Sequence, residues 1–126
     1  METLISNVNW PAVLLGTVVS FVLGMFWFGQ IFGKRWAAGS HDITPPAGLP
    51  IGAMIAQLIG TFLMALVIGA TETVHDMPTA LATIFGIAAL QLGGSLFGQK
   101  STVAAVIDGG FVIAMGVIMI AAQAVL

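Results

Sequence analysis

The chain has 126 residues, of which 59% are hydrophobic and only 6% are charged. Because a soluble domain carries roughly 25% charged residues and a fold of this size leaves much of its surface uncovered, this composition excludes an ordinary soluble protein. The net charge of −2 provides no basic patch for nucleic acid, and the absence of cysteine excludes disulfides, thiolate metal sites and thiol catalysis. The composition is typical of a single domain, residues 1–126, in a lipid bilayer.

The first apolar run is expected to form a transmembrane helix over about residues 10–32. Asn9 is a suitable N-cap, and Pro11 lies in the first turn, where its missing N–H does little harm. Trp10 and Trp36 bracket the run, and tryptophan favours the two headgroup levels of a membrane. Their separation along a helix is roughly 40 Å, which matches a bilayer measured to its interfaces. We therefore expect both tryptophans to be interface anchors.

Three further apolar runs are each long enough to cross a bilayer, which takes about 20 residues of helix. A linker is expected over residues 34–50, because three prolines between positions 45 and 50 prevent a regular helix. The later spans are expected over about residues 51–70, 79–97 and 102–125, with a tight turn before the last. The predicted fold class is therefore all-α, an integral membrane bundle of four transmembrane helices.

Residues 29–35 and residues 94–100 share the pattern Gly-x-[Ile/Leu]-Phe-Gly-x-[Lys/Arg] at corresponding ends of the first and third spans. The match predicts a weak internal duplication, in which two helical hairpins have the same orientation. The glycines of the repeat are interpreted as helix-packing positions, within the bundle or between subunits. The alternative is that they mark an ion or substrate passage, since repeats build many transporters. These glycines are Gly29, Gly33, Gly94 and Gly98.

All three basic residues of the chain, Lys34, Arg35 and Lys100, follow the first and third spans. Two spans separate these connections, so both lie on one side of the membrane. Since cytoplasmic loops carry the excess of Lys and Arg, both termini are expected on the outer side. The three basic residues are therefore interpreted as topology-setting.

Gln57, Gln91 and Asp108 each lie about six or seven residues from the same side of the membrane, which is a depth of roughly 10 Å. Asp108 is the charged residue inside a predicted span, and an unpaired carboxylate there costs a few kcal/mol, so a partner is expected. One hypothesis is a proton or cation site formed by the three side chains. The alternative is a hydrogen-bonded structural clasp.

Enzyme chemistry has no visible site in the sequence. Glu72, His75 and Asp76 could share a helical face, but a second His or a Cys for a metal is missing. A solvated loop is the expected structure, with Asp76 as the N-cap of the third span. Neither a nucleophile–base pair nor a phosphate-binding loop is present. We therefore expect no catalytic residue, no metal and no cofactor.

Short motifs near both ends of the chain form a set that resembles one family. They are Asn9-Trp10-x-Ala12, Phe21-Val22-Leu23-Gly24, Trp27-Phe28-Gly29, Phe32-Gly33-Lys34-x-Trp36, Ile107-Asp108-Gly109-Gly110-Phe111 and Met115-Gly116. The set resembles the domain-of-unknown-function family numbered 1761, over nearly the whole chain. Its members are small bacterial membrane proteins, so the resemblance implies a multi-pass protein of the bacterial cytoplasmic (inner) membrane. The family has no settled activity, so no catalytic residue is implied.

One motif departs from the family pattern. Where the family has Trp-Tyr-x-Pro, this chain has Trp27-Phe28-Gly29-Gln30, which lacks a hydroxyl and a helix-ending proline. The first span is therefore expected to run straighter here.

The function that these observations favour is a structural or accessory one. Such a protein self-associates into an oligomer or packs against a larger membrane complex, and its partners are the lipid bilayer and other transmembrane helices. The alternative is a small proton- or cation-coupled transporter or channel that uses the Asp108 layer. A continuous polar stripe through both leaflets would favour transport, but the polar groups lie mainly in one half of the spans.

Overall fold

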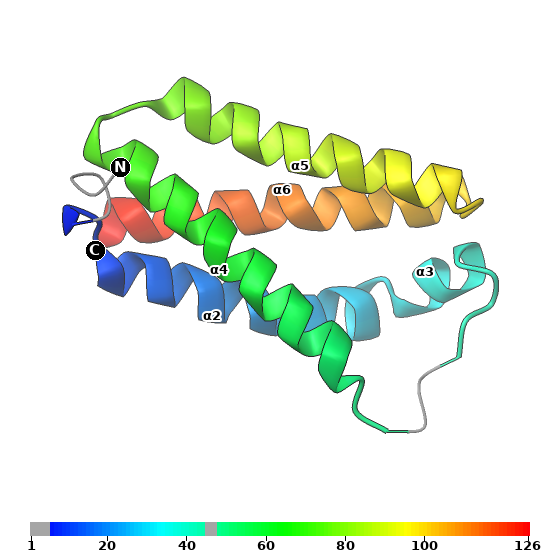
Figure 1. The fold of residues 1–126 in the computed structure, drawn as a ribbon. Coiled ribbons are helices and arrows are strands. Elements are labelled where there is room, and N and C mark those ends of the chain that lie inside the picture. Colours follow the sequence, from blue (N-terminus) through cyan, green and yellow to red (C-terminus); the bar gives the residue numbers. More distant parts are fainter. Residues whose placement is uncertain (1–5, 45–47) are drawn as a thin grey trace.

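A computed structural model of the chain describes residues 6–44 and 48–126. In this part of the chain four helical spans are long and apolar enough to cross a membrane, which confirms the predicted fold class (Figure 1). The first is α2 (Trp10–Phe26) continued by the π-helix η1 (Trp27–Ile31). The others are α4 (Ile51–Thr73), α5 (Met77–Phe97) and α6 (Thr102–Val125), and a short helix, α3 (Gly33–Gly39), follows η1. These bounds lie within three residues of the ranges expected from hydrophobicity.

Three of the spans begin at a polar residue that accepts a hydrogen bond from the first turn, as N-caps do. The Asn9 side chain accepts from the Ala12 N–H at 3.3 Å, and that of Ser101 accepts from the Ala104 N–H at 3.1 Å. Asp76 caps α5 and accepts from the N–H of Thr79 at 3.1 Å. The N-caps predicted at Asn9 and Asp76 are therefore confirmed.

Helix α6 is the centre of the bundle. In its most apolar stretch 56% of the residues are buried, against 22% to 28% in the other spans. Figure 1 shows α6 between α5 on one side and α2 and α4 on the other. Small residues on α6 let α5 come close: a Cβ on Gly116 would lie 2.6 Å from Cδ1 of Ile84, and one on Gly109 would lie 3.2 Å from the Ala88 carbonyl oxygen. Gly109 and Gly116 therefore lie at the contact between α5 and α6, and neither belongs to the repeated motif.

The first span is not a regular α-helix to its end, and the expectation that it runs straighter than the family pattern stays a prediction. It widens into η1 and stops at Phe32, whose φ of −118° and ψ of 7° leave the helical region. The indole N–H of Trp27 donates to the Ile107 carbonyl oxygen at 3.0 Å, and the Phe28 ring lies 5.2 Å from that of Phe111. A π-turn shifts the helical register, and here it accompanies two consecutive aromatic residues that both face α6.

The connection after the first span also differs from the expected linker, because residues 33–39 form α3. Residues 32–50 thus include a helix, whereas residues 98–101 join α5 directly to α6. The two hairpins therefore have dissimilar connections, and their duplication stays a prediction. Figure 1 shows α3 and the α5–α6 turn at one end of the bundle, and the α4–α5 turn, the start of α2 and the end of α6 at the other.

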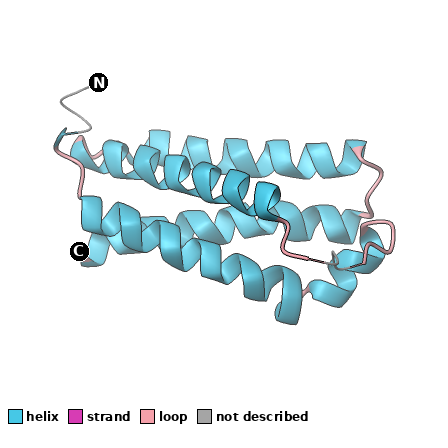
Figure 2. Ribbon diagram, turned by 60° about the horizontal axis from the view of Figure 1, so that its bottom comes forward, coloured by secondary structure: helices cyan, strands magenta, loops and turns pink. Residues whose placement is uncertain are grey.

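The first half of α4 stands apart from the other helices. All residues from Ile51 to Gly60 are exposed except Met54, which is half-buried. Figure 1 shows α4 diverging from α5 toward Ile51, and Figure 2 shows the same bundle from a second direction. Apart from Met54, the surface of this half-helix is consequently open to lipid or to another molecule.

Candidate functional site

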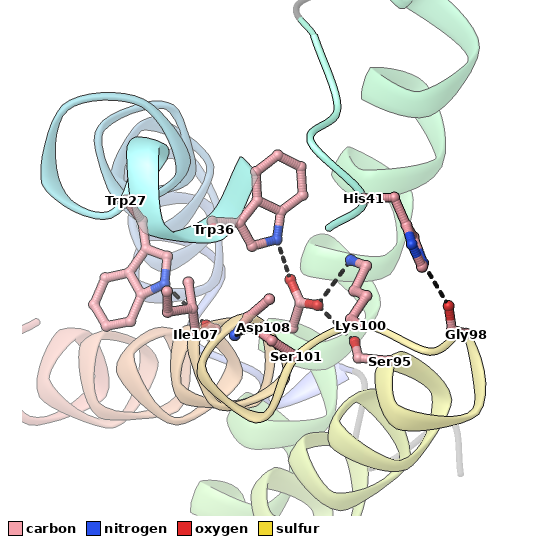
Figure 3. Close-up of polar contacts among 10 residues, drawn as sticks. Trp27, Trp36, His41, Ser95, Gly98, Lys100, Ser101, Ile107 and Asp108 are labelled. Carbon is pink, nitrogen blue, oxygen red and sulfur yellow. Dashed lines mark hydrogen bonds and ion pairs between the residues drawn. The ribbon is translucent and has the colours of Figure 1, made fainter. Parts of the chain in front are cut away.

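A buried carboxylate on α6 joins four segments of the chain (Figure 3). Asp108 is only 3% exposed. Its Oδ1 accepts a hydrogen bond from the indole N–H of Trp36 on α3 at 2.8 Å. Its Oδ2 accepts from the Ser95 hydroxyl on α5 at 2.5 Å and from the Lys100 ammonium in the α5–α6 turn at 2.9 Å. We call these four residues the Asp108 cluster.

The charges of the Asp108 cluster balance. Removing a carboxylate from water is unfavourable unless an opposite charge and further hydrogen bonds replace the lost hydration. Lys100 supplies the charge, and its side chain is 25% exposed, so the ammonium lies at the edge of the bundle while its partner lies inside. The ammonium is also 5.1 Å from the centre of the Trp36 ring, within the range of a cation–π interaction. The cluster is thus a satisfied ion pair, as a structural clasp requires.

Further contacts fasten the segment around α3 to the α5–α6 turn. The N–H of Ser101 donates to the Gly39 carbonyl oxygen at 2.8 Å, and Nε2 of His41 lies 2.8 Å from the carbonyl oxygen of Gly98. Gly39 must be small here, because a Cβ would overlap the Ser101 hydroxyl. His41, which lies in the loop after α3, therefore has a partner in the α5–α6 turn. These contacts close one end of the bundle.

A cavity of about 290 Å³ lies beside the cluster, between α4, α5 and α6. Gln57, Gln91 and Asp108 all line it, so the structure brings the three predicted residues to one place. Asp108 nevertheless forms its hydrogen bonds with other residues, and both glutamines are exposed. The partner expected for Asp108 is thus supplied by α3, α5 and the α5–α6 turn, and a functional role for the layer of three residues stays a prediction.

The partners of Asp108 could have been found in part from the sequence. A carboxylate in a span needs a partner, and Lys100 is the nearest basic residue along the chain. A long lysine stem lets its ammonium lie away from its own backbone position. Ser95 and Trp36 carry no comparable signal, since the Trp36 contact joins residues 72 positions apart.

The two predicted interface anchors have different surroundings. Trp10 is 38% exposed and stacks on Phe62 with 6.5 Å between ring centres, at the opposite end from the Asp108 cluster. Trp36 is half-buried and is held by Asp108 and the Phe28 ring, 5.2 Å away. Trp36 is therefore part of the cluster rather than a side chain directed only at headgroups.

The remaining predicted residues lie outside the cluster. Lys34 and Arg35 are exposed on α3, and with Lys100 they put all three basic residues at one end of the bundle.

The glycines of the repeat contact no neighbouring helix. A Cβ on Gly29 or Gly94 would meet open space, and a Cβ on Gly33 or Gly98 would meet only the backbone of the preceding turn. The prediction that these glycines pack helices within the chain is therefore wrong, and contact between subunits stays a prediction.

Four long apolar spans, with the Asp108 carboxylate buried among them, define a small multi-pass membrane protein. Across residues 6–44 and 48–126 no group of three or more His, Cys, Asp or Glu side chains could hold a metal ion. Over residues 11–122 the chain matches the family described as Protein of unknown function (DUF1761), and it belongs to that family. No curated protein and no solved structure matches it significantly.

Proposed function

We propose that this protein is a structural or accessory component of the membrane, which self-associates or packs against a larger membrane complex. The observation that carries the proposal is the isolated first half of α4. One side of α4 presents Ile51, Ile55, Ile59 and Leu63 at a helical spacing of four, and all are between 52% and 62% exposed. Transmembrane helices associate by close packing of side chains against a neighbour, and within this half of α4 every residue except Met54 is exposed.

The Asp108 cluster supports the same proposal. An ionisable side chain inside a membrane is a functional candidate by default, but the Asp108 carboxylate already has an ion pair and two hydrogen bonds. This arrangement holds α3 and the α5–α6 turn on the bundle. The role that we propose is therefore non-enzymatic.

The first test is purification from native membranes in a gentle detergent, followed by mass measurement of the intact particle. We expect a mass above that of the 13.0-kDa chain, from further copies or from a stoichiometric partner. A monodisperse single chain with nothing attached would contradict the proposal.

Cysteine cross-linking separates the two forms of the proposal, because the natural chain has no cysteine. Ile55→Cys places one thiol on the exposed side of α4, and Phe85→Cys places one on α5 with similar exposure, 53% and 58% respectively. Self-association through α4 predicts a disulfide-linked dimer in membranes for Ile55→Cys but not for Phe85→Cys. A stoichiometric complex without any cross-link between copies would favour the accessory role.

The second candidate is a small proton- or cation-coupled transporter. The observation that favours it is the cavity, which has Asp108 on its wall beside Gln57 and Gln91. Asp108→Asn keeps the shape and removes the charge. If vesicles with the natural chain carry a proton or cation flux that the folded Asp108→Asn variant lacks, the transporter replaces the structural role. Equal ion leakage from both vesicles supports the structural role.

We further propose that the protein lies in the bacterial cytoplasmic membrane with both termini outside. The three basic residues at one end of the bundle support this orientation. Single-cysteine variants test it with a membrane-impermeant maleimide on spheroplasts. Val74→Cys, in the α4–α5 turn, should be labelled, whereas Ala38→Cys, on α3, should require permeabilisation. The opposite labelling pattern would show that the topology is the reverse of the proposed one.

A further inference from the structure

The cavity between α4, α5 and α6 has the size and position of a site for a lipid-soluble molecule. Its volume of about 290 Å³ is near the lower end of ligand pockets, which is roughly 300 Å³. That space accommodates a ring-sized head group rather than a complete lipid. Its lining includes Gln57 on α4 and Gln91 on α5, and Figure 1 shows these two helices diverging toward the start of α4.

Two amide side chains mark the depth of the cavity in the membrane. Gln57 and Gln91 are each six residues from a helix end, at Ile51 and Phe97, on the same side of the bundle. At 1.5 Å per residue this is a depth of about 9 Å. A molecule would therefore reach these amides from the hydrocarbon region of the bilayer and not from water.

Both amides are available for a ligand. They are exposed, and within residues 6–44 and 48–126 neither side-chain amide has a hydrogen-bond partner. An unpaired amide in hydrocarbon is unfavourable, and each amide can donate two hydrogen bonds and accept others. A partner with carbonyl or hydroxyl oxygens satisfies them, whereas an alkyl chain does not.

The ion pair of the Asp108 cluster determines which ligand charge the cavity favours. Asp108 lines the cavity, but the Lys100 ammonium already occupies the place beside the carboxylate that a bound cation would take. The ion pair leaves the wall with no net charge to attract an anion. The site therefore favours an uncharged molecule.

The remaining walls favour a flat, polarisable group. The rings of Phe28 and Phe111 lie 5.2 Å apart at the cavity, in an edge-to-face arrangement. Met64 and Met115 line it as well, and thioethers make favourable contacts with ring systems. Aromatic walls, soft sulfur atoms and a few polar groups are the composition of a small-molecule site.

We propose that this cavity binds an uncharged, lipid-soluble molecule whose flat head group carries carbonyl oxygens, of the quinone class. Gln57 and Gln91 donate their amide hydrogens to the carbonyl oxygens, the ring lies against Phe28 and the methionines, and the tail leaves the cavity between α4 and α5 into the bilayer.

Tryptophan fluorescence provides the binding measurement, since quinones quench indoles at short range. Trp36 is hydrogen-bonded to Asp108 on the cavity wall, and the Trp27 ring lies 6.0 Å from that of Phe111. The full chain in nanodiscs is titrated with a decyl-tailed benzoquinone. A decyl-tailed benzene, with the same tail and no carbonyl oxygen, is the competing probe. We expect saturable quenching by the quinone and no competition by the benzene.

Matched variants locate the site. Gly60 lines the cavity and Gly86 lies on α5 outside it, and both have open space where a side chain would start. Gly60→Leu should fill the cavity and abolish saturable quenching, while Gly86→Leu should retain it. Gln57→Leu and Gln91→Leu should each weaken binding by about threefold to tenfold, the range of one neutral hydrogen bond. Thermal unfolding of every variant checks that it folds.

Several results would overturn the assignment. One is quenching that never saturates, and another is equal competition by the decyl benzene. A third is a Gly60→Leu variant that binds the quinone as tightly as the Gly86→Leu variant does. Displacement of the quinone by phosphatidylglycerol would contradict an uncharged ligand. Quantitative disulfide formation between copies of Gln57→Cys would show that a second chain, and not a small molecule, fills the cavity. Gln57 faces the cavity, so this cross-link is distinct from the Ile55→Cys one on the exposed side of α4.

Discussion

The ammonium group of Lys100 lies 2.9 Å from Oδ2 of Asp108, eight positions further along the chain. Lys100 precedes α6 and Asp108 lies within it, so the lysine side chain extends along the helix toward the carboxylate. A residue that resembles a solvated loop lysine therefore neutralises the buried carboxylate of the bundle. Loop residues and span residues of this protein form one electrostatic unit at that end.

Removal of the lysine should leave the buried carboxylate without its counter-charge. We expect Lys100→Met to lower the free energy of unfolding by about 3 kcal/mol, the lower end of the range for breaking a buried ion pair, since the lysine is partly exposed. The measurement is equilibrium unfolding in mixed micelles. Lys34→Met, on the exposed side of α3, is the control and should change it by less than about 0.5 kcal/mol. Equal effects of the two substitutions would contradict the role of the ion pair.

The indole of Trp36 should stabilise the fold through one hydrogen bond to Asp108. Trp36→Phe keeps a ring and removes the donor at 2.8 Å, and a hydrogen bond to a charged group contributes about 1.5–3 kcal/mol. Urea unfolding in micelles should show a loss in that range. Trp10→Phe, at the far end of the bundle, retains a ring near Phe62 and should lose clearly less. A larger loss at Trp10 would mean that ring area, and not the hydrogen bond, matters.

Glycine substitutions should distinguish the helix contacts of α6 from the open positions of the repeat. A Cβ on Gly116 meets three Ile84 atoms at 2.6–2.8 Å, so Gly116→Ala should cost about 1–3 kcal/mol as an overpacked core does. Gly94→Ala meets open space and should instead stabilise α5 by about 0.4–1 kcal/mol. Thermal unfolding in detergent compares the two variants. If Gly94→Ala instead lowers oligomer mass, that glycine contacts another subunit.

The N-cap of α5 should make stability depend on acid. The side-chain hydrogen bond from Thr79, followed by its backbone N–H bond, holds the pKa of Asp76 below its ordinary value of 3.8. A carboxylate with a lowered pKa stabilises the fold above its unfolded-state value, and the effect is lost as pH falls through the folded-state value. Asp76→Ala should therefore destabilise the protein at pH 7, and the difference from the natural chain should shrink below pH 3.8.

Stability measured by unfolding at pH 7, 5 and 3 gives this comparison. Asp42→Ala, in an exposed position after α3, is the control at each pH. A difference between Asp76→Ala and the natural chain that is as large at pH 3 as at pH 7 would contradict the cap.

Local features of the sequence determined the four spans, the caps at Asn9 and Asp76 and the common end of the basic residues. This is because a span depends on the length of an apolar run and a cap on its own first turn. The tertiary structure alone determined which donors reach Asp108. It also determined that Gly116, and not Gly94, contacts a neighbouring helix, and that the side of α4 with Gln57 stays open. Those features depend on how helices cross, so they join residues as distant as Trp36 and Asp108, which no local pattern connects.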